Sequence, residues 1–196
     1  MPKKGSYAKG IAKREEILSR ALEVFADKGY RKASLREIAE SVGLSQAGLL
    51  HHFSSKEELF SEVLRKRDEV DTGGADLGDQ WADAADGLVR VIRHNAEVPG
   101  LVQLYATLSA EAADPEHPGH DYFVERYEKI VGGLEQHVRA EQAAGRMTDA
   151  VDARQLARLG IAVADGMQVQ WMLDPSADMA DALTAFWSLV RTAPAT

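Results

Sequence analysis

The chain has 196 residues, of which 45% are hydrophobic and 28% are charged, proportions that are ordinary for a globular protein. It contains no cysteine, which excludes disulfides, thiolate metal sites and a cysteine nucleophile. No apolar run reaches the roughly 18 residues of a membrane helix, and the first residues lack the apolar segment of a secretory signal. We therefore expect a cytoplasmic protein with no membrane partner.

The net charge of −8 is divided unevenly along the chain. Residues 1–67 carry 14 Lys and Arg against 9 Asp and Glu, whereas residues 68–196 carry 9 against 22. A basic segment can approach phosphates and an acidic one repels them, so only the first part is expected to touch nucleic acid. Two ordinary solvated surfaces would give the same distribution, and charge alone does not separate these alternatives.

Residues 1–10 lack periodicity and predict a mobile basic arm, whose lysines reach either the minor groove of DNA or only solvent. A helical pattern starts at Ile11 and ends near Gly29. Its apolar stripe consists of Ile17, Leu18, Ala21, Leu22 and Phe25. A capping box at Ser34 and Glu37 then opens a short second helix.

Ser45 is suited to cap a third short helix, and a second capping box at Ser55 and Glu58 opens a fourth. Residues 71–79 contain three glycines and three aspartates, a composition typical of a linker. Five more helices are expected beyond it, over residues 81–97, 101–113, 121–144, 152–173 and 178–192. No segment alternates with a period of two, so the fold class is all-α with about nine helices.

Residues 34–53 contain the sharpest pattern in the chain. Ala39 is small enough for two helices to cross closely, Gly43 suits a tight left-handed turn, and Leu49 can fill the core between the helices. This spacing indicates a helix-turn-helix, which presents the start of its second helix to the major groove of DNA. An ordinary helical hairpin with small packing residues is the alternative.

The start of that second helix is expected to contact base edges. Gln46 has an amide that can pair with adenine, and Ala47 can touch the methyl group of thymine. Ala47 and Gly48 add no bulk, so the helix can enter the groove deeply. The candidate base-contacting residues are Ser45, Gln46, Ala47 and Gly48.

The N-terminal part resembles the tetracycline-repressor (TetR) family of transcriptional regulators. The residues that carry the resemblance lie in segments 17–30, 34–39, 42–45 and 49–59. The resemblance implies an all-helical homodimer with a three-helix DNA-binding head, a connecting helix and a larger helical domain for ligand binding and dimerisation. It implies no particular ligand.

The resemblance also implies roles for individual residues. Ser34 matches a hydroxyl that holds a phosphate, and Arg36 matches a contact to phosphate or base. His51 and His52 match positions that meet the DNA backbone, and Lys56 matches a lysine that meets phosphate. Leu50 and Gly48 stand where the family usually has tyrosine and threonine, so no operator sequence is implied.

Together these features predict four segments. Residues 1–54 form the basic arm and the DNA-binding domain, and residues 55–70 form the connecting helix. Residues 71–80 form the linker, and residues 81–196 form the ligand-binding and dimerisation domain. Within the last segment, helices 152–173 and 178–192 are expected to form a two-fold four-helix interface.

Several side chains with an aromatic body or a polar tip are candidates to line a ligand cavity, although simple core packing explains the same spacing. They are Trp81, His94, Tyr105, Tyr122, Tyr127, Asp165, Met167, Gln168 and Trp171.

No catalytic residues are assigned, because the sequence lacks a phosphate-binding glycine loop and a nucleophile motif. His117 and His120 have a spacing that could hold a metal, but the surrounding Pro and Gly favour a polar loop, so neither metal nor cofactor is expected.

The sequence therefore predicts a ligand-responsive, non-enzymatic transcriptional regulator. We expect a homodimeric repressor that binds a palindromic double-stranded operator and is released by an unknown small-molecule effector. One alternative is a helical enzyme or metal-binding domain with a coincidental helix-turn-helix pattern. The other is a regulator that has lost its effector.

Overall fold

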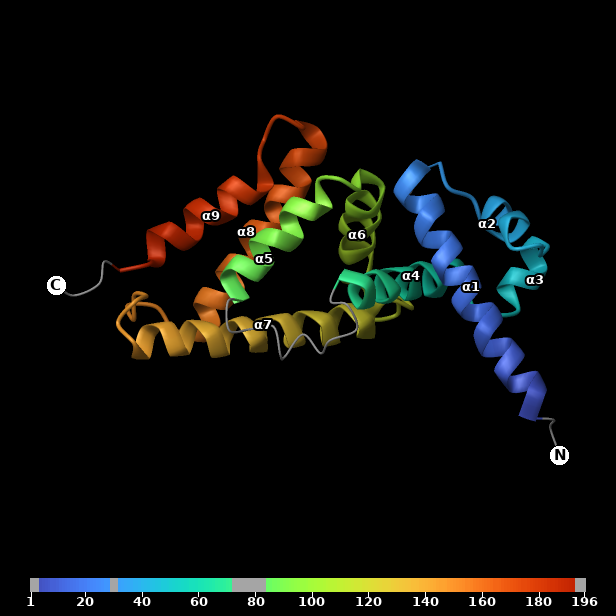
Figure 1. The fold of residues 1–196 in the computed structure, drawn as a ribbon, viewed down its shortest axis with the longest axis horizontal. Coiled ribbons are helices and arrows are strands. Elements are labelled where there is room, and N and C mark those ends of the chain that lie inside the picture. Colours follow the sequence, from blue (N-terminus) through green and yellow to red (C-terminus); the bar gives the residue numbers. More distant parts are fainter. Residues whose placement is uncertain (1–3, 29–31, 72–83, 193–196) are drawn as a thin grey trace. The chain divides into compact units, whose positions relative to one another are not determined.

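The computed structural model describes residues 4–28, 32–71 and 84–192. Over these residues the chain is all-α, with nine helices and no strand (Figure 1). The helices are α1 (Lys4–Lys28), α2 (Leu35–Ser41), α3 (Gln46–Leu50), α4 (Lys56–Asp71), α5 (Ala84–Asn95), α6 (Pro99–Glu111), α7 (His120–Ala143), α8 (Ala153–Leu173) and α9 (Met179–Val190). The predicted fold class is confirmed.

The helix boundaries differ from the expectation at the N-terminal end. Helix α1 begins at Lys4, whereas the apolar pattern begins only at Ile11. A helix that is already nucleated gains one backbone hydrogen bond for each added residue, so it extends through polar residues that carry no packing signal. The rest of the predicted arm, residues 1–3, lies outside the described residues, as do the predicted linker 72–80 and the ligand candidate Trp81.

The described residues fall into two compact units. The first comprises residues 1–70 together with 98–122, and the second comprises residues 71–97 together with 123–196. In the first unit α1 packs against both α2 and α6, and α2 packs against α3. Phe25 of α1 and Phe60 of α4 meet edge to face with their ring centroids 4.8 Å apart. The predicted division of roles among segments 1–54, 55–70, 71–80 and 81–196 stays a prediction.

In the second unit, α9 packs against both α8 and α5 (Figure 1). Asp152 and Asp178 cap α8 and α9, each accepting hydrogen bonds from two backbone N–H groups of the first turn. Gly160 of α8 lies directly against the indole ring of Trp187, which is 1% exposed. The missing side chain at Gly160 therefore lets α8 and α9 approach closely.

No helix of the described ranges is both long enough and apolar enough to cross a membrane.

Candidate nucleic-acid interface

The turn between α2 and α3 has the geometry that the spacing of small residues predicts. Gly43 has a φ of +68°, in the left-handed region that glycine adopts without strain. The backbone N–H of Leu44 donates to the carbonyl of Ala39 over 2.8 Å, which closes the turn. Ala39 and Leu49 are both fully buried, so the two short helices share one dry contact. The two helices are thus held as a rigid pair.

Ser45 caps α3 and leaves the start of the helix open to solvent. Its side-chain oxygen accepts a hydrogen bond from the backbone N–H of Gly48 over 3.1 Å. Gln46 and Ala47 are exposed, and Gln46 makes no side-chain hydrogen bond within the described part of the chain. Gln46 therefore has its amide available for a base edge.

Gly48 is constrained by the same cap. A Cβ atom at Gly48 would lie 3.3 Å from the Ser45 side-chain oxygen, tighter than an ordinary contact. A larger residue such as the threonine usual in the TetR family would therefore press on the hydroxyl that caps the helix. Glycine at this position preserves both the cap and the close approach that the sequence predicts.

The predicted phosphate contacts lie at the starts of neighbouring helices. Ser34 caps α2 by accepting from the backbone N–H of Glu37 over 3.2 Å. Arg36 is exposed, and its Nε donates to Glu40 over 3.0 Å. Lys56, also exposed, begins α4 and has its ammonium 5.1 Å from the centroid of the Phe60 ring. Helix starts carry positive partial charge, which favours phosphate there.

Helix α3 ends at Leu50, so His51 and His52 lie in the following turn. Their ring centroids are 6.2 Å apart; His51 is exposed and His52 is half-buried. The two imidazoles therefore belong to the turn after α3 and not to the helix itself. Their contacts with DNA stay a prediction.

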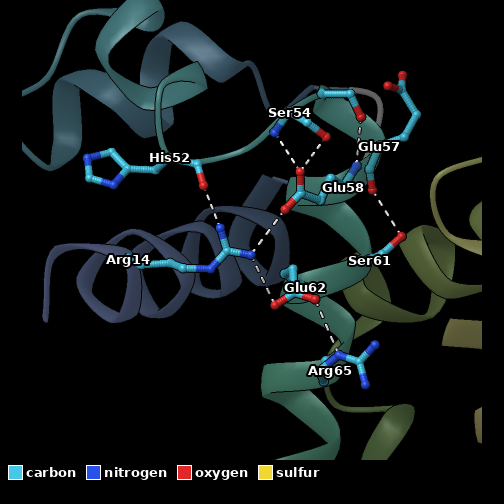
Figure 2. Close-up of polar contacts among 9 residues, drawn as sticks. Arg14, His52, Ser54, Glu57, Glu58, Ser61, Glu62 and Arg65 are labelled. Atoms are coloured by element: carbon cyan, nitrogen blue, oxygen red, sulfur yellow. Dashed lines mark hydrogen bonds and ion pairs between the residues drawn. The ribbon is translucent and has the colours of Figure 1, made fainter. Parts of the chain in front are cut away.

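Arg14 of α1 joins the end of this turn to α4, a role that the sequence analysis missed (Figure 2). Its Nη1 donates to the backbone carbonyl of His52, and its Nη2 contacts Glu58 over 3.2 Å and Glu62 over 3.3 Å. The guanidinium also stacks 4.2 Å from the centroid of the Phe53 ring. The Arg14 side chain thus holds the turn that follows α3 in a fixed position relative to both α1 and α4.

The position of Arg14 in the sequence could have indicated that it has a partner inside the fold. Arg14 precedes Leu18 by four residues and Ala21 by seven, so it lies on the apolar stripe of α1. Helical stripes that face a core rarely include a cation without a partner. A charge on such a stripe indicates a buried or half-buried ion pair, although it does not name the partner.

Glu58 satisfies several donors at the start of α4. The backbone N–H of Glu58 donates to the side-chain oxygen of Ser55 over 3.0 Å, as the predicted capping box requires. The Glu58 carboxylate, however, accepts from the N–H and hydroxyl of Ser54, one residue before the cap (Figure 2). Partial burial alone would raise the pKa of Glu58, but the hydrogen bonds from Ser54 and the charge of Arg14 lower it below its ordinary value.

The first capping box also differs from its prediction. Ser34 accepts from the Glu37 backbone as expected, but the Glu37 carboxylate binds the ammonium of Lys28 at the end of α1. This hydrogen bond and the negative charge of Glu37 raise the pKa of Lys28. The contact ties α2 to α1 on the surface of the head.

The predicted ligand residues are divided between the two units. In the first unit Tyr105 is buried, and the Tyr122 hydroxyl donates to Asp68 over 2.9 Å. In the second unit the Tyr127 hydroxyl donates to Asp165 over 2.7 Å, and Gln168 donates to the same carboxylate over 3.4 Å. The second group therefore forms a connected polar cluster.

The remaining candidates have simpler surroundings. Met167 and Trp171 pack, partly buried, against the core of the second unit. His94 is exposed and contacts Glu97 over 3.1 Å. His117 and His120 both bind backbone groups through Nδ1, and the described residues contain no cluster of three or more potential metal ligands. Ligand contacts by any of these side chains stay predictions.

Comparison with known proteins identifies the family of the N-terminal part. Residues 17–63 match the family model of bacterial regulatory proteins of the tetR family. This range covers the apolar stripe of α1, the complete helix-turn-helix and the first half of α4. This N-terminal part of the chain belongs to the TetR family. Members of this family are DNA-binding transcription factors.

Relatives of this chain are named as transcriptional repressors. The repressor KstR2 of Mycolicibacterium smegmatis is 44% identical over 54 residues, 28% of this chain and 26% of that protein. The repressor Rv1474c of Mycobacterium tuberculosis is 28% identical over 143 residues, 71% of this chain and 72% of that protein. The alignment with KstR2 thus spans only about a quarter of the length of that protein, a stretch no longer than a DNA-binding head.

Solved structures of transcriptional regulators resemble the whole fold. A regulator from Agrobacterium tumefaciens aligns with a TM-score of 0.72 and 21% identity, covering 93% of this chain and all of that one. A regulator from Saccharomonospora viridis, solved in complex with choline, aligns with a TM-score of 0.68 and 23% identity, covering 92% and 98%. At this identity the likeness concerns the fold.

Proposed function

We propose that this chain is a transcriptional repressor that binds double-stranded operator DNA through the exposed start of α3. The observation that carries the proposal is the rigid helix-turn-helix: Ser45 caps α3, and Gln46 projects from it without an internal partner. Side chains held this way on a short helix can meet base edges in the major groove. Such a protein would work in the cytoplasm, where bacterial DNA lies.

The surrounding residues would set the position of the head on the duplex. Ser34 and Lys56 lie at the starts of α2 and α4, where helix dipoles and hydrogen-bond donors favour phosphate. Phosphate contacts supply affinity without sequence information, whereas Gln46 would supply the sequence choice. Arg36 would contribute as a phosphate contact if it exchanged its exposed partner Glu40, an ion pair of little stability at the surface.

The apolar side chains left exposed on α8 and α9 support a homodimer. Leu159 and Val169 of α8 are 44% and 48% exposed, and Leu189 of α9 is 84% exposed. Large apolar side chains gathered on two neighbouring helices are typical of an interface. A second copy is the occupant we propose, because a two-fold dimer pairs two recognition helices on a palindromic operator.

The effector would bind in the second unit near the cluster of Tyr127, Asp165 and Gln168. Gln168 is 3% exposed, and its side-chain oxygen has no hydrogen-bond donor in the described part of the chain. A buried polar atom without a partner costs stability, and a ligand that donates a hydrogen bond would remove that cost. The similar regulator from Saccharomonospora viridis shows that this fold can hold a small molecule.

Release from DNA would be a shift between conformations. An effector that favours an arrangement with the wrong spacing of the two recognition helices lowers operator affinity by its preference for that arrangement. The connecting helix α4 and its Arg14 contact would transmit this spacing to the head.

The proposal is tested by a gel shift with the full chain and the DNA upstream of its own gene, against a shuffled duplex of equal composition. We expect specific binding at least about 10³-fold tighter than the shuffled duplex at the same salt. Equal affinity for both duplexes, or no binding to either at low salt, would contradict it.

A further inference from the structure

A small hollow between α5 and α9 contains none of the residues assigned above to DNA, dimer or effector contacts. Its volume is about 250 Å³, and it is contained within the second unit. Val89 and Trp187, which are 8% and 1% exposed, form its apolar part. Three arginines, Arg90, Arg93 and Arg191, line it together with Asp86.

This concentration of positive charge is unexpected in an acidic part of the chain. Residues 68–196 contain nine Lys and Arg against 22 Asp and Glu, and three of those nine line this one hollow. On α7 and α8, by contrast, Arg139, Arg154 and Arg158 each contact a carboxylate of α7. A cluster of cations is therefore a local feature of this hollow.

Two of the three guanidinium groups have no carboxylate partner among the described residues. Arg191 contacts Asp86 over 3.0 Å, which occupies the only carboxylate that lines the hollow. Arg90 and Arg93 form no ion pair with any carboxylate of the described residues. They are three residues apart on α5, so their side chains project from the same face of the helix.

Two neighbouring guanidinium groups are suited to a carboxylate, which each can bind through two parallel N–H donors. Val89 and Trp187 add apolar atoms to the wall beside the arginines, so the hollow can contact the organic body of a ligand as well as its charged end, which an inorganic anion lacks. We propose that this hollow binds a small organic carboxylate, its charged end on Arg90 and Arg93 and its apolar body against Val89 and Trp187. The site shares no residue with the proposed effector cluster, and its test needs no DNA.

The test uses the full chain and sodium benzoate, followed by isothermal titration calorimetry at constant ionic strength. Benzamide, which has the same shape without the charge, and inorganic phosphate, which has charge without an apolar body, are the comparison ligands. We expect saturable benzoate binding, with benzamide and phosphate at least about tenfold weaker. Equal binding of phosphate would overturn the assignment to organic carboxylates, and equal binding of benzamide would overturn the role of the arginines.

The double variant R90Q/R93Q should bind benzoate at least about tenfold more weakly, whereas R139Q/R158Q, which removes the same charge from α7 and α8, should bind as the unmodified chain does. Equal affinity in both double variants, or no saturation by benzoate below about 10 mM, would overturn the proposal.

Modification of arginines by phenylglyoxal gives a second measurement, on the chain without substitutions. Benzoate should protect Arg90 and Arg93 but not Arg158, and equal protection of all three would contradict the site.

Discussion

Individual side chains on the head divide into those that would choose a sequence and those that would hold the DNA. Gln46 projects from the start of α3 and has an amide that matches an adenine edge. Lys56 starts a different helix and offers a single positive charge. Replacing Gln46 should therefore change the choice of sequence, whereas replacing Lys56 should change the overall affinity for DNA.

Gln46→Ala should reduce discrimination at one position of the operator by about 1–3 kcal/mol, because a bidentate base contact is lost. Lys56→Ala should weaken binding to all sequences and flatten the salt dependence by about 1 in the slope of log affinity against log salt. Fluorescence anisotropy with a set of singly substituted duplexes at several salt concentrations measures both effects. Equal loss of specificity in the two variants would contradict these roles.

Glu58 should give the head a pH-dependent stability. Its pKa is lower in the folded chain than its ordinary value of 4.5, so its contribution is complete above that value and is lost as the pH falls through the lowered pKa. Urea unfolding of the chain and of Glu58→Gln at several pH values measures this. The destabilisation by the substitution should be constant from neutral pH to about pH 5 and should shrink in more acidic solution. A difference that grows on acidification would show the opposite sign.

Among the helices, local sequence signals predict best the features that depend on the backbone alone, such as caps and turns. Ser34 and Ser45 cap helices as expected, and Gly43 adopts the left-handed turn. Partners that are distant in the sequence could not be predicted. The carboxylates of Glu37 and Glu58 bind Lys28, Ser54 and Arg14 in place of their expected capping partners. Such contacts depend on how helices cross, which no local pattern specifies.

The same limit applies to the candidate ligand residues. Tyr105 and Tyr122 fall in the first compact unit and Tyr127 in the second, a division that helical spacing does not reveal, and a shared ligand cavity stays a prediction. Tyr127 and Asp165 are 38 residues apart and form a hydrogen bond, which the apolar periodicity of their helices does not reveal. Periodicity predicts which face of a helix is buried, and not which neighbour buries it.

The close packing of α8 on α9 gives a prediction for an element contact. A Cβ atom at Gly160 would lie 2.6 Å from Cζ2 and 2.8 Å from Cη2 of the buried Trp187 ring. Gly160→Ala should therefore destabilise the chain by about 1–3 kcal/mol through overpacking, despite the better helix propensity of alanine. Gly132→Ala on α7, where a Cβ meets nothing within 4 Å, is the control and should be neutral or slightly stabilising. Denaturant unfolding compares the two, and equal effects would contradict the packing role.

At the scale of the whole molecule, the proposed dimer depends on the exposed apolar side chains of α8 and α9. Replacing both Leu159 and Leu189 with Glu should convert the dimer to a monomer, because charges would be buried without partners at the interface. Light scattering after size exclusion measures the mass. Val124→Glu on α7, at a side chain that is 48% exposed, is the matched control and should leave the dimer intact. A dimer that survives the double substitution would place the interface elsewhere.

The central claim is that two copies of the exposed segment 45–48 contact bases of one operator together. Footprinting of the full chain on its own upstream DNA tests it most directly. We expect two protected half-sites with centres about 34–36 Å apart, one helical turn, and weaker protection of the inner bases with Gln46→Ala. A single protected site, or protection that is unchanged by replacing Gln46, would contradict it.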